Sequence, residues 1–116
     1  MKNSLSDYDL YEEIQQKRKQ LDFSIKSLRG NGIELAKAER DYKILLRQEC
    51  LKLRDDGMAV GMITMTAYGI PSVAEARFKR DCAEAVYLAN QEAINSIKLE
   101  IRLIESQLKR EWGNAE

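Results

Sequence analysis

The feature that most constrains this chain is the stretch from Ser72 to Trp112, which contains neither glycine nor proline. It predicts a single helix of ~40 residues, about 60 Å long at 1.5 Å per residue. Pro71 precedes it, and Ser72 with Glu75 forms a capping box, in which each side chain satisfies a free backbone N–H. Gly113 is expected to end the helix. Any fold of this chain must therefore supply neighbours along a very long helix.

Apolar residues recur along this helix mostly every four positions, which predicts a nearly straight helix rather than a strict heptad supercoil. In its second half, Leu99 and Leu103 lie nearly opposite the main stripe, because residues two apart are separated by ~200° around a helix axis. That half needs contacts on more than one side. The main stripe comprises Phe78, Cys82, Val86, Ala89, Ala93, Ile97, Ile101, Ile104, Leu108 and Trp112.

Two further helices are predicted at about 6–29 and 33–56. They are separated by Gly30-Asn31-Gly32, whose residues tolerate positive φ and commonly end helices. Ser4 or Ser6 is expected to cap the first helix. Its thin apolar seam comprises Tyr11, Ile14, Leu21, Ile25 and Leu28. The wider face of the second comprises Leu35, Ala38, Tyr42, Leu45 or Leu46, and Leu53, with Ile44 and Leu51 at its margins.

Residues 57–71 carry no charge in a chain that is 33% charged. Gly57 is expected to end the preceding helix and Gly69 to end a short helix at 61–68. The segment is too short to span a bilayer, which needs ~20 apolar residues. Two interpretations remain open: it plugs one end of the helical assembly, or its flexible methionines form a docking surface for a partner. The candidate interface residues here are Met58, Met62, Met65 and Tyr68.

A local excess of positive charge provides an alternative site, for nucleic acid. Basic side chains beside an aromatic ring, here Phe78, can neutralise phosphates while the ring stacks on a base. Phe78 belongs to the apolar stripe, however, and Asp81 and Asp55-Asp56 adjoin the cluster, so this interpretation ranks second. The candidate residues are Arg54, Arg77, Lys79 and Arg80.

Composition argues against catalysis. The 116 residues contain no histidine, which removes the Ser-His and Cys-His nucleophile arrangements and the carboxylate-histidine metal sites of helical bundles. No glycine-rich phosphate loop is present. We therefore expect no enzyme, no cofactor and no metal. The 19 basic and 19 acidic residues balance, so no net charge draws the chain to a membrane. Cys50 and Cys82 are expected to be buried free thiols.

These elements predict an all-α fold of a single domain, 1–116, with the C-terminal helix at 72–112. It is a three-helix bundle if Gly30-Asn31-Gly32 reverses the chain, and an elongated antiparallel helical hairpin if that segment only kinks it. The second helix can cover only about 24 residues of the long one. The apolar end beyond that cover predicts a homodimer or higher oligomer, with the candidate interface residues Ile101, Leu103, Ile104, Leu108 and Trp112.

One resemblance bears on function. The segments that carry it are Glu39-Arg40-Asp41-Tyr42, Leu53-Arg54-Asp55-Asp56-Gly57-Met58, Val73 to Asp81, Ala93-Ile94-Asn95 and Glu111-Trp112-Gly113. Over roughly its last two-thirds, the chain resembles a family of small uncharacterised proteins encoded by temperate phages and prophages of Gram-positive bacteria. The resemblance implies a phage protein in the host bacterial cytoplasm and supplies no site residues.

Two classes of function follow as expectations. The first is a non-enzymatic phage accessory protein that oligomerises and binds a host or phage protein; an inhibitor of host defence, of the anti-CRISPR kind, is one such case. The second is a nucleic-acid-binding or recombination accessory protein that uses the basic cluster. Salt dependence separates them, because phosphate contacts weaken steeply as salt rises.

Overall fold

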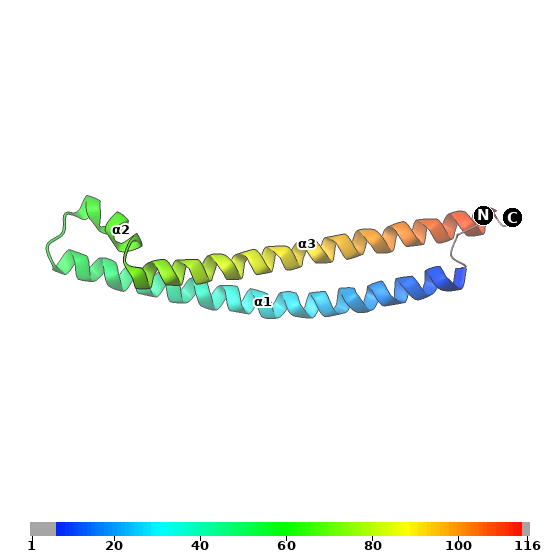
Figure 1. Ribbon diagram of the computed structural model, residues 1–116, viewed down its shortest axis with the longest axis horizontal. Coiled ribbons are helices and arrows are strands. Elements are labelled where there is room, and N and C mark those ends of the chain that lie inside the picture. Colours follow the sequence, from blue (N-terminus) through cyan, green and yellow to red (C-terminus); the bar gives the residue numbers. More distant parts are fainter. Residues whose placement is uncertain (1–6, 115–116) are drawn as a thin grey trace. The chain divides into compact units, whose positions relative to one another are not determined.

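The computed structural model describes residues 7–114, and within them the fold is all-α, with no strand. Helix α1 spans Asp7–Asp55, α2 spans Val60–Tyr68 and α3 spans Pro71–Asn114 (Figure 1). The prediction of one long C-terminal helix is confirmed, at 44 residues. The predicted caps Ser4 and Ser6 lie outside the described residues.

The predicted break at Gly30-Asn31-Gly32 is wrong, because α1 continues through it as one helix of 49 residues. Each glycine costs about 1 kcal/mol relative to alanine inside a helix, which packing against other elements can outweigh. Gly32 has a packing role of its own: a Cβ built on it would lie 3.2 Å from Cε1 of Tyr87. Gly32 therefore allows the Tyr87 ring of α3 to approach α1 closely, and it does not end a helix.

The chain divides into two compact units. Unit 1 comprises Met1–Arg29 and Ala89–Glu116, and unit 2 comprises Gly30–Leu88. The sequence predicted a single domain, and the two boundaries fall inside α1 and inside α3 rather than in a loop.

In unit 1, the start of α1 runs antiparallel to the end of α3. The Trp112 indole donates a hydrogen bond to Asp7, Lys17 pairs with Glu100, and the Asn90 amide donates to the Ser24 carbonyl. These contacts match the predicted alternative in which the first helix lies beside the C-terminal tail. The core is formed by Leu10, Ile14 and Ile104, with Leu108 against it.

The buried seam of the first helix differs from the predicted one at two of its five positions. Leu10 is 1% exposed, whereas Tyr11 and Ile25, both predicted to face inward, are exposed. The side of α1 that becomes buried is the side that faces α3, and the sequence of α1 alone does not specify which side that is. Ile14 is buried as predicted, and Leu21 and Leu28 are half-buried.

In unit 2, α2 packs beside the end of α1 and the start of α3 (Figure 1). The predicted face of α1 is confirmed here, because Tyr42 is buried and Leu35, Ala38, Leu45 and Leu53 are half-buried. The buried residues of this unit are Tyr42, Ile63, Ala67 and Val73.

The corner between α1 and α2 follows the predicted turn chemistry. Gly57 has φ +91°, a conformation that strains other residues, and its N–H donates to the Arg54 carbonyl at 3.0 Å. The Met58 N–H donates to the Leu53 carbonyl at 3.1 Å, so two free carbonyls at the helix end are satisfied. Gly69 ends α2 as predicted.

Helix α3 begins earlier than predicted. Pro71 is its first residue, and the Ala74 N–H donates to the Ile70 carbonyl at 2.9 Å, so Ile70 rather than Ser72 is the residue that caps it. Proline suits this first position because its fixed φ is helical and its missing N–H would have no partner there. The predicted capping box is therefore wrong. The helix also continues past Trp112 to Asn114.

The apolar stripe of α3 is buried only in its second half. Ile104 is buried and Ile97 and Ile101 are half-buried, but Phe78 is 63% exposed. Unit 2 packs a different side of α3, through Val73, Ala83 and Tyr87. The residues of the predicted stripe that lie exposed are Phe78, Cys82, Val86, Ala89, Ala93 and Trp112.

Candidate protein-interaction surfaces

The methionine-rich corner is both a plug and a surface. Ile63 and Ala67, on the inner side of α2, are 8% and 0% exposed. On its outer side, Met62 and Met65 are 60% and 75% exposed. The four-residue spacing of the buried pair leaves the intervening side chains to the outside, as on any helix with one packed face. The outer side is an apolar surface without a partner in the described part of the chain.

The remaining candidates at the corner are closer to the core. Met58 is half-buried, and the guanidinium of Arg77 lies over the Tyr68 ring, 5.1 Å from its centroid. A cation over an aromatic face is an attraction worth about 0.5–1 kcal/mol at an exposed site. The Arg77 guanidinium therefore lies between one face of the Tyr68 ring and the solvent.

The C-terminal candidates divide into two groups. Ile104 is buried against Leu10, and Ile101 and Leu108 are half-buried, so the expectation that these three lack cover is wrong. The cover comes from the start of α1. Leu103 and Trp112, in contrast, remain 60% and 62% exposed.

Polar contacts hold the two helices of unit 1 in register. The Trp112 Nε1–H donates to Asp7 Oδ2 at 3.0 Å, which fixes the ring at its polar edge and leaves its faces exposed. The hydrogen bond from Lys17 holds the pKa of Glu100 below its ordinary value. The carboxylate therefore stays charged at lower pH than a free glutamate.

The four candidate nucleic-acid residues differ in their surroundings. The Arg80 guanidinium lies 4.8 Å from the Tyr42 ring centroid and bonds to Asp81, a hydrogen bond that raises the pKa of Arg80. Arg77 covers Tyr68. Lys79 and Arg54 line two different hollows of unit 2. Two of the four cations, Arg77 and Arg80, are thus engaged by side chains of the protein itself.

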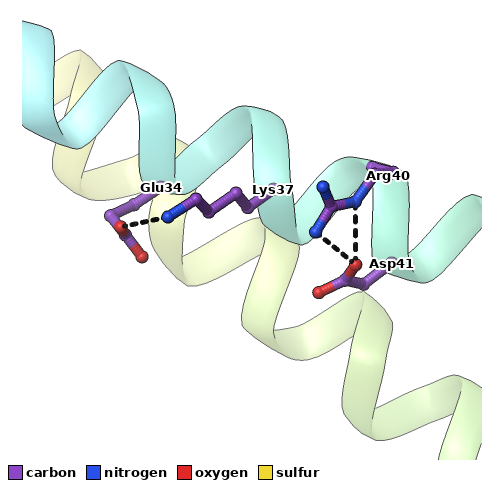
Figure 2. A network of polar contacts seen from close by, with 4 residues as sticks. All are labelled: Glu34, Lys37, Arg40 and Asp41. Atoms are coloured by element: carbon purple, nitrogen blue, oxygen red, sulfur yellow. Dashed lines mark hydrogen bonds and ion pairs between the residues drawn. The ribbon is translucent and has the colours of Figure 1, made fainter.

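The larger hollow, of about 530 Å³, lies between α1 and α3 in unit 2. Ala38, Ala76 and Ala83 leave the space, because facing alanines cannot fill the gap between two helices. Its α1 edge carries ion pairs along the helix, from Glu34 to Lys37 at 3.7 Å and from Arg40 to Asp41 at 3.1 Å (Figure 2). These four side chains satisfy one another.

The second hollow, of about 400 Å³, lies between α1 and α2. We call it the arginine hollow; its lining includes Arg47, Cys50, Leu51, Arg54, Val60 and Ile63. The sequence interpretation did not identify it. A signal was present, because Arg47 and Arg54 are seven residues apart and therefore share one side of a helix with Leu51.

Within residues 7–114, no group of three or more carboxylate and thiol side chains is placed to hold a metal ion. None of the helices in that part of the chain combines the length and apolar character that a membrane crossing requires. Comparison with protein-family models, with curated proteins and with solved structures found no match.

Proposed function

We propose that this chain is a non-enzymatic phage accessory protein that self-associates and binds a host or phage protein in the host bacterial cytoplasm. The resemblance to phage and prophage proteins supports a phage or prophage as the source of the chain. The exposed apolar surfaces of both units support binding to protein. The engagement of Arg77 and Arg80 by tyrosine rings favours this function over nucleic-acid binding.

The observation that carries the proposal is the amount of apolar surface left uncovered. In unit 1, two helical segments pack on each other and Leu99 and Leu103 are 54% and 60% exposed. In unit 2, Phe78, Val86 and Leu88 are exposed. These side chains are apolar surface that a partner could cover, and a stable interface covers about 800 Å² on each partner.

Self-association is tested by measuring the molar mass in solution with light scattering after gel filtration. We expect a dimer or larger species at micromolar concentration. Leu103→Glu, which places a charge on an exposed apolar position, should lower the mass and leave the helical circular dichroism spectrum unchanged. A wild-type mass equal to one chain at this concentration would contradict self-association.

Partner binding is tested separately by capture from host lysate. Met62→Glu adds a charge at the exposed methionines, and Gln48→Glu, at an exposed position of α1, is the matched control. Loss of one captured protein with Met62→Glu but not with Gln48→Glu would locate the interface at α2. An inhibitor of host defence is one form of this function, and the captured protein would then be a defence component.

A further inference from the structure

The arginine hollow combines an apolar floor with two cations that have no carboxylate partner. Arg47 and Arg54 are exposed, and neither forms an ion pair within the described part of the chain. Between them lies Leu51, 44% exposed, and α2 contributes Val60 and the buried Ile63. Such a site fits a segment that carries both negative charge and an apolar or aromatic side chain.

The start of α1 in unit 1 is a segment of that chemistry. Tyr8 and Tyr11 are 70% and 56% exposed, although aromatic rings usually pack into a core. Asp9 and Glu12 are exposed beside them. We call Asp7–Glu12 the acidic tyrosine segment. Asp7 accepts the hydrogen bond from Trp112, so the segment is held on α3 and its tyrosines remain available.

We propose that the acidic tyrosine segment of one copy docks in the arginine hollow of a second copy. This inference rests on the proposed self-association and names the two surfaces that meet. The carboxylates of the segment would pair with Arg47 and Arg54, and a tyrosine ring would occupy the apolar space above Leu51. The charges are complementary on the two surfaces, which is what specifies partner and register at an interface.

Size and ring chemistry support this docking. A cavity of roughly 150 Å³ holds a benzene ring, and the hollow is about 400 Å³. The protein already places arginine over tyrosine twice, with Arg77 on Tyr68 and Arg80 on Tyr42. A docked Tyr8 or Tyr11 would repeat this contact with Arg47 or Arg54, neither of which forms an ion pair among residues 7–114.

The docking joins two different surfaces, one from each copy. This gives a test by complementation between two full-length variants. The hollow variant carries Arg47→Glu and Arg54→Glu, and the segment variant carries Tyr8→Ser and Tyr11→Ser. All four positions are exposed, so both variants should fold with the wild-type circular dichroism spectrum.

Each variant alone should lose its self-association, with a dissociation constant raised about tenfold or more, since central aromatic and arginine contacts dominate interfaces. An equimolar mixture should recover one contact and form a complex of one copy of each, measured by light scattering. The control Arg18→Glu with Arg29→Glu changes the charge equally at exposed positions of α1 in unit 1, and it should associate like the wild type.

Failure of this inference is distinguishable from failure of the proposed function. A self-associating wild type whose mass neither variant changes would overturn the docking and leave self-association standing. Variants that dissociate singly but do not recover in the mixture would also overturn it, since two copies of one shared surface would behave in this way. A wild type that is monomeric throughout would remove both proposals.

Discussion

Gly32 of α1 lies against the ring of Tyr87 of α3, close enough that a Cβ at position 32 would meet Cε1 at 3.2 Å. Gly30, two residues earlier in the same helix, has no atom within 4 Å of such a Cβ. The two glycines therefore have different roles in one helix, and their substitution separates helix propensity from packing.

Gly30→Ala should stabilise the protein by about 1 kcal/mol, because alanine loses less backbone freedom than glycine in a helix and nothing obstructs its methyl group. Gly32→Ala should gain less or destabilise, because the Tyr87 ring must move. Urea unfolding followed by circular dichroism measures both. A loss of stability in Gly30→Ala would indicate that the helix ends there in a left-handed residue.

The Lys17–Glu100 pair should make unit 1 sensitive to acid. The pKa of Glu100 is lowered in the folded chain by the hydrogen bond from Lys17, so the stabilisation is present above the ordinary value of 4.5 and is lost as pH falls through the folded value. The difference in unfolding free energy between wild type and Glu100→Gln should shrink over that range. Parallel pH profiles for wild type and Glu100→Gln would contradict the role of the pair.

Arg80 should contribute to stability and Lys79 should not. Arg80→Ala removes the contact with the Tyr42 ring and the bond to Asp81 and should cost about 1 kcal/mol of unfolding free energy. Lys79→Ala, at the exposed neighbouring position, should stay within about 0.5 kcal/mol of wild type. Thermal unfolding of the two variants checks this prediction. Equal losses of stability would show that the contacts of Arg80 add nothing to the stability of the fold.

The two free cysteines should differ in reactivity. Cys82 is exposed and Cys50 half-buried, so the sequence expectation that both are buried is wrong for Cys82. Access of the reagent limits the reaction of a thiol. In the native protein, a thiol-specific dye should react in a fast and a slow phase, and Cys82→Ser should remove the fast one. Loss of the slow phase instead would reverse the assignment.

Local signals predicted the elements that depend on local chemistry. The absence of glycine and proline between Ser72 and Trp112 predicted the long helix, and Gly57 and Gly69 predicted the ends of α1 and α2. The face of α1 around Tyr42 was also readable, because its apolar residues recur with helical spacing.

The incorrect predictions depend on contacts between residues that are far apart in the sequence. Gly32 was interpreted as a stop signal, since the ring that requires it comes from Tyr87, far along the chain. In α3, Phe78 and Val86 have the spacing of a core stripe, but the unit packs Val73 and Ala83 instead. The arginine hollow could not be predicted as a cavity, because its walls come from two helices whose contact depends on the Gly57 corner.

The antiparallel pairing in unit 1 has a consequence for biosynthesis. Its contacts join residues as distant as Asp7 and Trp112, 105 positions apart. A chain leaves the ribosome at about 5–20 residues per second, so the opening part of α1 waits several seconds for the helix that shields Leu10. Unit 2 has all of its own residues available earlier, and the apolar seam of the nascent first helix is meanwhile open to chaperones or to neighbouring chains on the same message.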